Sequence, residues 1–316
     1  MAVVLAVDLG RTGCRAGVWT GRGEEPRATR EVPGTPGLAA PGGAAEAGTV
    51  VLAIARELLR AAGVRRVDAV CVGAAGALAA PEAARALAGA VLAGLPAEET
   101  AVTSDAVTAH AGALGIATGV VLAAGTGAVA VGVGPDGAFT IVDGWGPWLG
   151  DEGSGAWIGL AGLRCALRAH DGRGRPTALL QAAADRFGEL PRLPGVLGEG
   201  GNPARLAASF APDVARAAGA GDAAAAEIMR SAAAALGEAV TTAARRTCGG
   251  EPAPVAVTGG LVNLGEPLLG PLRAALADNA PALRLREPLG DPLSGARLLA
   301  GHAEGPQEPL VVRLRR

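Results

Sequence analysis

The sequence predicts an α/β protein with two domains, each a mixed sheet flanked by helices, and a central cleft between them. Its 316 residues are enough for two domains of ordinary size. Three segments share one plan, in which an apolar strand leads through a glycine-rich turn into more apolar chain, at 3–19, 119–133 and 254–268. The first two segments are typical of β-hairpins. Two weakly similar halves, each opening with a hairpin, indicate an internal duplication.

The first half alternates between strand and helix patterns. Helical periodicity covers 50–62 and 81–92, and the run RVDAVCVG predicts a buried strand at 66–73. A further short strand is expected at 99–102. Thr103, Ser104 and Asp105 then cap a predicted helix that continues to Leu114.

The second half is mostly helical. Its predicted helices cover 157–169, 177–187, 204–218 and 222–247. The segments 24–45 and 188–203 are rich in proline and glycine and are expected to be loops, the first of them able to close over a ligand. The charged residues after Gly301 are expected to be peripheral.

The absence of lysine excludes several kinds of chemistry. All 28 basic residues are arginine. A Walker-A loop and a protein kinase both need a lysine beside the phosphates, and Schiff-base chemistry needs an amine. A protein of this composition must bind phosphate through backbone amides, hydroxyls, arginine or a metal ion.

Charge and cysteine content indicate which partners and which cellular compartment to expect. The net charge of −2 gives no sign of a nucleic-acid or membrane partner, and no run of about 20 apolar residues occurs. The apolar N-terminus reaches Asp8 without a preceding basic region, which predicts a strand and not a signal peptide. Four scattered cysteines without a CxxC pair argue against structural zinc and fit a cytoplasmic protein.

The segment 143–159, DGWGPWLGDEGSGAWIG, is the strongest indication of a binding site. It holds Trp145, Trp148 and Trp157 in a chain that is only 2% aromatic, with Asp151 and Glu152 between glycines. Glycines let backbone amides approach a ligand, carboxylates accept hydrogen bonds from hydroxyls, and a large ring can wall a pocket. Any one of these tryptophans alone is better explained as core, but the cluster favours a site for a sugar-like molecule.

The two hairpin turns are candidate phosphate sites. The first runs from Gly10 through Thr12 to Gly13, after Asp8 at the end of a buried strand, and the second is Gly125-Thr126-Gly127. Successive amides in such turns bind phosphate oxygens, and an aspartate at a strand end can hold Mg²⁺ through water. Asp105, at a helix start, is the candidate base. Taken alone, each turn also fits a plain hairpin, and Asp105 fits a helix cap.

Together these motifs resemble the BadF/BadG/BcrA/BcrD ATPase family, in its N-acetylglucosamine kinase branch, within the sugar kinase/actin/Hsp70 superfamily. VDLGRTG is similar to the first phosphate motif, TSDAVTAHAG with VLAAGTGAVAVG to the run that carries the catalytic aspartate and second phosphate loop, and VAVTGGLVNLGEPLL to the adenosine motif. GWGPWLGDEGSG is the most specific match, and DPLSGARLLA resembles the closing helix.

The resemblance implies two actin-like/ribonuclease H-like domains, at 1–114 plus 292–316 and at 115–291. It implies an ATP- and Mg²⁺-dependent kinase for an amino sugar, with N-acetylglucosamine first and glucosamine or N-acetylmuramic acid close behind. A homodimer is suggested by analogy only. The implied roles are Asp105 as base, which also meets the sugar; Asp8 for Mg²⁺; Gly10, Thr12, Gly13, Gly125, Thr126 and Gly127 at the phosphates; Gly259 and Gly260 at the adenosine; Thr126, Trp145, Gly146 and Asp151 at the sugar.

The chain departs from the family pattern at three places. Arg11 replaces a small glycine, Ala128 follows GTG where a serine is frequent, and the 34–44 loop lacks an asparagine that recognises N-acetylglucosamine in relatives.

Two other functions stay open. One alternative is an ATPase that activates a partner enzyme through a [4Fe–4S] cluster, although Cys71 and Cys165 lack the glycine-flanked setting. The other is a non-catalytic sugar sensor, since fold does not fix activity.

Overall fold

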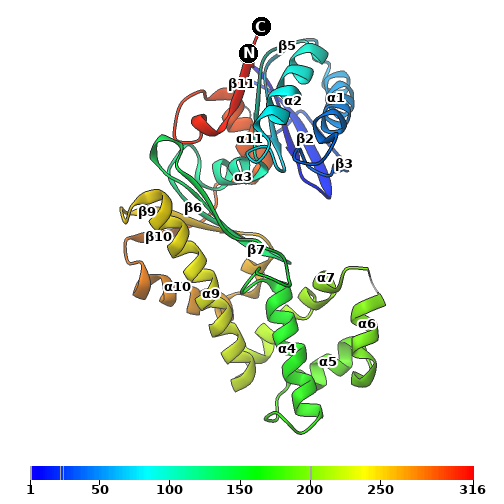
Figure 1. Ribbon diagram of the computed structural model, residues 1–316, viewed down its shortest axis with the longest axis vertical. Coiled ribbons are helices and arrows are strands. Elements are labelled where there is room, and N and C mark those ends of the chain that lie inside the picture. Colours follow the sequence, from blue (N-terminus) through cyan, green and yellow to red (C-terminus); the bar gives the residue numbers. More distant parts are fainter. Residues whose placement is uncertain (1, 22, 24, 200) are drawn as a thin grey trace. The chain divides into compact units, whose positions relative to one another are not determined.

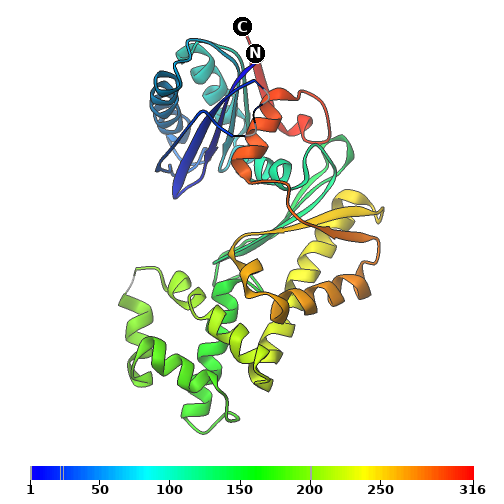
Figure 2. The ribbon, with the colours of Figure 1, turned by 180° about the vertical axis from the view of Figure 1, so that it is seen from behind.

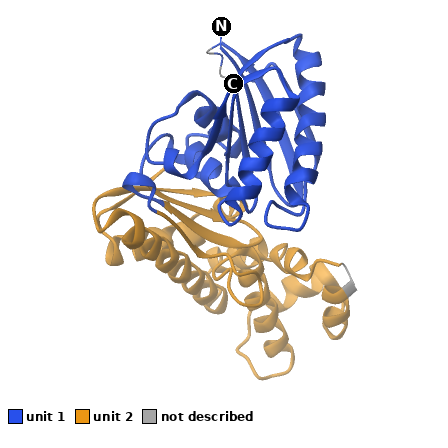
Figure 3. Cartoon of the chain, turned by 45° about the horizontal axis from the view of Figure 1, so that its top comes forward, with its two compact units in different colours: residues 1–118, 133–138, 288–316 blue, residues 119–132, 139–287 orange. Residues whose placement is uncertain are grey.

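The computed structural model (Figures 1 and 2) contains two sheets. These sheets have the same strand order over five strands. The structure describes residues 2–21, 23, 25–199 and 201–316. These residues form two units, at 1–118, 133–138 and 288–316 and at 119–132 and 139–287 (Figure 3). The predicted α/β class with two mixed, helix-flanked sheets is confirmed. The predicted domain bounds and the cleft stay predictions.

Unit 1 contains a six-stranded sheet of order β11-β5-β4-β1-β2-β3. Its strands are β1 (Val3–Leu9), β2 (Gly13–Thr20), β3 (Ala28–Pro33), β4 (Val67–Ala74), β5 (Ala97–Thr103) and β11 (Val312–Arg315). β1 pairs antiparallel with β2 and parallel with β4, so the sheet is mixed. The register sets Asp8 opposite Arg15 on β2 and Gly73 on β4. Facing residues of paired strands share one side of the sheet, so Asp8 and Arg15 lie together.

Helices cover both faces of this sheet. α1 (Gly43–Ala62) and α2 (Pro81–Gly94) pack against the inward side chains of β1, β2, β4 and β5 to form one core. On the other face lie α3 (Asp105–Leu114) and α11 (Pro292–Gly301). A Cβ at Gly295 would lie 1.9 Å from the carbonyl oxygen of Thr108, so only glycine permits this approach of α11 to α3. The approach carries Asp291, the N-cap of α11, to the edge of β2.

Unit 2 repeats the plan with a five-stranded sheet of order β10-β9-β6-β7-β8. Its strands are β6 (Gly119–Ala124), β7 (Ala128–Val133), β8 (Phe139–Asp143), β9 (Ala253–Thr258) and β10 (Leu283–Arg286). β6 pairs parallel with β9, whereas the three residues between β6 and β7 can join only antiparallel neighbours. The matching order of the two sheets is what an internal duplication produces.

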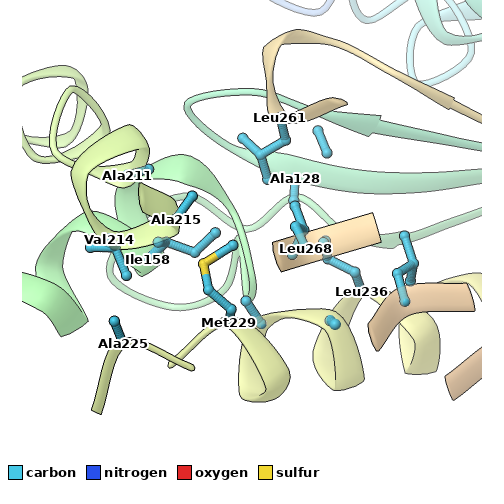
Figure 4. Packing of buried hydrophobic residues seen from close by; sticks show 14 of the residues in the cluster. Ala128, Ile158, Ala211, Val214, Ala215, Ala225, Met229, Leu236, Leu261 and Leu268 are labelled. Carbon is cyan, nitrogen blue, oxygen red and sulfur yellow. The ribbon is translucent and has the colours of Figure 1, made fainter. Parts of the chain in front are cut away.

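The helices of unit 2 build a second core, part of which is shown in Figure 4. They are α4 (Gly155–His170), α5 (Leu179–Phe187), α6 (Leu193–Glu199), α7 (Pro203–Ala208), α8 (Ala211–Gly219), α9 (Ala223–Cys248) and α10 (Glu266–Asn279). Alanines dominate the buried face of α9, which packs against β6 and β8 and against α10. None of the helices in the described chain combines the length and apolar character needed to cross a membrane.

Two segments expected to be loops are partly regular. Within 24–45, of which residue 24 lies outside the described chain, the structure has β3 and the first turn of α1. β3 is an edge strand with mostly exposed polar side chains, so its sequence lacks the alternation that identifies a half-buried strand. Within 188–203, a 3₁₀ turn and α6 form because Leu190 and Leu193 enter the core.

The single helix expected at 204–218 is also wrong, because the chain forms α7 and α8 with a break before Ala211. Pro212 lies in the first turn of α8, the place where proline is compatible with a helix, and Phe210 at the break is fully buried. Both facts favour starting a new helix over continuing the old one.

The C-terminal segment is not peripheral as expected. β11 pairs antiparallel with β5 at the edge of the sheet, and Arg313 forms ion pairs with Glu99 and Glu308 while its side chain is only 9% exposed. Gln307 is buried and donates through Nε2 to the carbonyl oxygens of Gly115 (3.0 Å) and Ala117 (3.1 Å). The charges that suggested a solvated tail are instead partners of charges on unit 1.

Candidate functional site

The turn between β1 and β2 is supported by the chain that follows β3. Gly10 donates its N–H to the carbonyl of Gly13 at 2.9 Å, which closes the turn, and Arg11 and Thr12 lie at its tip. The N–H of Thr35 donates to the carbonyl of Gly10 at 3.3 Å. A Cβ at Gly34 would lie 2.2 Å from that carbonyl oxygen, so the contact requires glycine. Arg11 is exposed, so its side chain extends away from this support.

Asp8 belongs to a charged cluster beside this turn. Nη2 of Arg15 donates to Oδ2 of Asp8 at 3.4 Å and pairs with Oδ2 of Asp291 at 3.1 Å. Burial raises the pKa of Asp8, Arg15 opposes that shift, and the negative charges of Asp105 and Asp291 add to it. Asp105 and Asp291 thus lie near enough to Asp8 for their charges to act on it. The cluster thus contains three carboxylates, of Asp8, Asp105 and Asp291, and Arg15 can neutralise only one of their charges.

Asp105 is the first residue of α3 and leaves one carboxylate oxygen free. Ser104, not Asp105, is the N-cap, and its hydroxyl accepts from the N–H of Ala106 at 3.2 Å. Oδ1 of Asp105 accepts from Ser104 Oγ and from the N–H of Ala106, both at 2.9 Å. Oδ2 of the half-buried Asp105 has no hydrogen-bond partner among the described residues. One oxygen is thereby fixed while the other is available to accept a proton.

The turn between β6 and β7 is supported by a helix. Within the turn, the N–H of Gly125 donates to the carbonyl of Gly127 at 2.8 Å. The N–H groups of Gly155 and Ala156 donate to the carbonyls of Gly125 (2.8 Å) and Thr126 (3.0 Å). Those two donors belong to the first turn of α4, where backbone N–H groups otherwise lack partners. Thr126 is exposed, and a Cβ at Gly125 would have no described atom within 4 Å. The turn therefore presents open backbone on its outer side.

Asp151 lies directly against this turn. A Cβ at Gly127 would lie 2.6 Å from Oδ2 of Asp151, so the carboxylate occupies the space beside the glycine. The backbone of Asp151 is left-handed, with φ of 54°. Its N–H donates to Oδ1 of Asp143 at 2.8 Å. The sugar loop and the second phosphate turn of the sequence prediction are thus neighbours in unit 2.

The three tryptophans of the 143–159 segment have different surroundings. Trp145 and Trp148 are 76% and 77% exposed, whereas Trp157 packs against the core. The expectation of one cluster is therefore wrong for Trp157, because helix α4 turns its side chain toward the core. Gly146 has φ of 88°, and a Cβ there would have no described atom within 4 Å.

Gly259 brings the end of β9 to the end of β6. A Cβ at Gly259 would lie 2.4 Å from the carbonyl oxygen of Ala124, the residue before the second turn. Gly259 also has φ of 92°, which favours glycine. Gly260 begins a 3₁₀ turn, and a Cβ added to it would meet no described atom within 4 Å. The expected adenosine residues thus adjoin the expected phosphate turn within unit 2.

The predicted site residues fall into two groups. Unit 1 brings together Asp8, Asp105 and the Gly10–Gly13 turn, and unit 2 brings together the Gly125–Gly127 turn, Asp151 and Gly259. Sequence reasoning missed Arg15, Asp291 and Asp143 as members of these groups. Asp143 stands two residues before Trp145 and could have been noticed there. Arg15 and Asp291 are 276 positions apart in sequence and gave no joint signal.

Magnesium is compatible with Asp8. No group of three His, Cys, Asp or Glu side chains suited to a metal occurs in the described chain. Magnesium needs only one or two carboxylates, because it retains much of its water shell. Asp8 is partly exposed and lies among carboxylates whose charges disfavour one another, a setting in which added positive charge is favourable.

Two units with sheets of one strand order, each with a glycine turn after its first strand, define the class of actin-like sugar kinases and ATPases. The sequence matches the BadF/BadG/BcrA/BcrD ATPase family over residues 5–300. The chain belongs to this family, and the resemblance seen in the sequence is confirmed.

Three relatives illustrate the similarity. An N-acetylmuramic acid/N-acetylglucosamine kinase of Clostridium acetobutylicum is 38% identical over 78 residues, covering 25% of this chain and 26% of that protein. An N-acetyl-D-glucosamine kinase of Dictyostelium discoideum is 40% identical over 85 residues, 27% of each protein. Both alignments span about a quarter of the curated relative. A solved structure from Chromobacterium violaceum, provisionally assigned as an N-acetylglucosamine kinase, matches with a TM-score of 0.68 and 29% identity over 95% of this chain and 99% of that one.

Proposed function

We propose that this protein is an ATP-dependent kinase that phosphorylates a hydroxyl of an amino sugar, with N-acetylglucosamine as the first candidate and its 6-phosphate as the product. The observation that carries the proposal is the carboxylate of Asp105, whose Oδ1 accepts two hydrogen bonds while Oδ2 has no partner among the described residues. Membership of an ATPase family supports the use of ATP. The names of the relatives support an amino sugar as acceptor, with glucosamine and N-acetylmuramic acid as further candidates.

Asp105 is proposed to accept the proton of the attacking hydroxyl. As the sugar oxygen bonds to the terminal phosphorus of ATP, the bond from that phosphorus to the ADP oxygen breaks and the hydroxyl proton passes to Oδ2. Ser104 Oγ and the N–H of Ala106 hold Oδ1, so the carboxylate is oriented before the substrate binds. Such pre-orientation lowers the barrier because no side chain has to be ordered during the reaction.

Phosphate binding is assigned to the two turns. Gly10, Thr12 and Gly13 in unit 1, and Gly125, Thr126 and Gly127 in unit 2, offer amides and hydroxyls to phosphate oxygens. Asp8 would hold Mg²⁺ through water. The ion would neutralise charge on the phosphates, which is most of what phosphoryl transfer requires. Gly259 and Gly260 are proposed to adjoin the adenosine.

The sugar is assigned to the loop before α4. The carboxylate of Asp151 can accept hydrogen bonds from sugar hydroxyls, and Thr126 is exposed beside it. Trp145 offers a largely exposed ring, on which the apolar face of a sugar can stack. Gly146, which has open space where a side chain would stand, permits the ligand to approach the backbone.

An ADP-release assay over a panel of amino sugars tests the proposal. The panel contains N-acetylglucosamine, glucosamine, N-acetylmuramic acid, glucose and a no-sugar control, each with the wild type and with Asp105→Asn. Release that requires an amino sugar and is lost in the variant supports the kinase. Sugar-independent release would support an activating ATPase. Sugar binding without ADP release would support a sensor.

A further inference from the structure

Asp143 accepts hydrogen bonds from the two backbone N–H groups on either side of the Cα of Asp151, in the loop before α4. It ends β8, and its two carboxylate oxygens accept from successive residues: Oδ1 from the N–H of Asp151 and Oδ2 from the N–H of Glu152, each at 2.8 Å. Hydrogen bonds from N–H groups to a carboxylate are among the stronger ones in proteins. Two of them to one side chain fix the orientation of both N–H groups, and hence the backbone angles of Asp151 between them.

The loop is shaped to allow this contact. A Cβ at Gly150 would lie 2.2 Å from Oδ1 of Asp143, so the residue before Asp151 must be glycine for the carboxylate to reach. Asp143 and Asp151 both have left-handed backbones, with φ of 64° and 54°. This conformation is uncommon for residues other than glycine, although aspartate adopts it more readily than most, and surrounding contacts can stabilise it. The hydrogen bonds of Asp143 are such contacts for Asp151.

The fixed backbone aims the side chain of Asp151 at the second turn. Oδ2 of Asp151 lies 2.6 Å from the position that a Cβ of Gly127 would take. The φ and ψ of a residue fix the direction of its Cα–Cβ bond and restrict the rotamers of its side chain. Releasing the backbone of Asp151 would therefore move its carboxylate away from Gly127 and from its neighbour Thr126, beside which the sugar is proposed to bind.

We propose that Asp143 is a positioning residue for the acceptor sugar, which acts by holding Asp151 in its left-handed conformation. The inference rests on the proposed function, because it assigns Asp151 to the sugar. Asp143 does not itself contact the substrate in this scheme. It determines how well the sugar is bound and aligned, and leaves nucleotide binding unaffected.

Two variants and a matched control test the proposal. Asp143→Gly keeps a residue that tolerates the left-handed backbone and removes both hydrogen bonds. Asp143→Asn also tolerates it and keeps one acceptor oxygen, so its effect should be intermediate. Asp136 is the control, because it too has a left-handed backbone, with φ of 53°, and is exposed. Asp136→Gly and Asp136→Asn should behave like the wild type.

The expected result is a selective loss. In Asp143→Gly, kcat/KM for the sugar falls about 10- to 100-fold, as expected for a misaligned substrate group, while KM for ATP stays at the wild-type value. In an Asp151→Ala background, adding Asp143→Gly should change kcat/KM for the sugar little further, because the residue to be positioned is gone. A purely structural role would impair both substrates and would persist in that background.

Amide hydrogen exchange supplies a readout that does not depend on activity. The N–H groups of Asp151 and Glu152 should be protected in the wild type and should exchange faster in Asp143→Gly. Wild-type exchange rates and wild-type sugar kinetics in Asp143→Gly would overturn the inference. Absence of any sugar-dependent turnover in the wild type would instead overturn the proposed function, and the exchange result would still decide whether Asp143 holds the loop.

Discussion

The two glycine turns occupy the same place in two sheets of the same order, yet they offer different chemistry. The turn of unit 1 follows Asp8 and has Asp105, Arg15 and Asp291 around it. The turn of unit 2 has Asp151 beside it and is otherwise built from backbone, with the first turn of α4 donating to its carbonyls. The strand order therefore does not determine which chemical groups surround a turn. These groups come from residues that pack against the turn from segments distant in sequence.

This difference suggests that the two turns serve different steps of the proposed reaction. Unit 1 supplies carboxylates, which suit proton transfer and a metal ion. Unit 2 supplies open backbone at its turn, which suits phosphate, together with the loop assigned to the sugar. Substitutions in the two turns should therefore impair different steps.

The largest expected effect comes from unit 1. Asp105→Asn should lower kcat by about 1000-fold, within the range of a general base, while the Kd for ATP stays near the wild-type value. Single-turnover kinetics and nucleotide titration measure the two quantities. Ser104→Ala keeps the carboxylate but removes one of its hydrogen-bond donors, so its kcat should fall by much less. A turnover near normal in Asp105→Asn would remove Asp105 from the mechanism.

The strand that distinguishes the two sheets offers the next largest effect. Sheet 1 has β11 as an extra edge strand, and Arg313 on it pairs with Glu99 and Glu308. Arg313→Met should lower the free energy of unfolding by about 3 kcal/mol, because Glu308 loses this ion pair and the largely buried Glu99 keeps only its pair with the exposed Arg315. Arg315→Met is the control, since Arg315 pairs with the same Glu99 but is 65% exposed, and it should cost less than about 1 kcal/mol. Equal effects in urea unfolding would contradict a buried ion-pair network.

How far this fold could be predicted from the sequence depended on how local each signal was. The hairpins, the helix that starts at Asp105 and the glycine turns were predicted because their signals lie within a few residues. β11 was not, because its pairing with β5 joins residues more than 200 positions apart, and its charges suggested a tail. The exposure of Trp145 and the burial of Trp157 depend on the direction in which α4 leaves the loop, which composition does not indicate.

A substitution in the turn of unit 2 tests whether this turn binds the phosphates. Gly125→Ala meets no described atom within 4 Å, so the variant should fold normally. A methyl group against a bound phosphate would cost about 1–3 kcal/mol, so the KM for ATP should rise about 10-fold. Gly301→Ala, which also has open space around it, is the control. An unchanged KM for ATP in Gly125→Ala would separate this turn from the phosphates.

The smallest expected effects concern stability and pH. Burial raises the pKa of Asp8, so its ionisation weakens the fold as pH rises. Relative to the wild type, Asp8→Asn should gain stability as pH rises from below 3.8, its ordinary pKa, to neutrality. Asp291 should show the opposite trend. Burial alone would raise its pKa, but hydrogen bonds from Ser294 and the charge of Arg15 lower it, so Asp291→Asn should lose stability over the same range. Thermal unfolding of both variants at a series of pH values measures these trends. Trends of the same sign would contradict the opposite pKa shifts of Asp8 and Asp291.

The most direct test of the sugar-kinase proposal follows the terminal phosphoryl group of ATP. Wild-type protein, Mg²⁺, N-acetylglucosamine and ATP labelled in that group are incubated, and the products are separated. We expect the label to appear in a sugar phosphate, and Asp105→Asn to form almost none. Label released as inorganic phosphate whether or not sugar is present, or no transfer to any amino sugar, would contradict it.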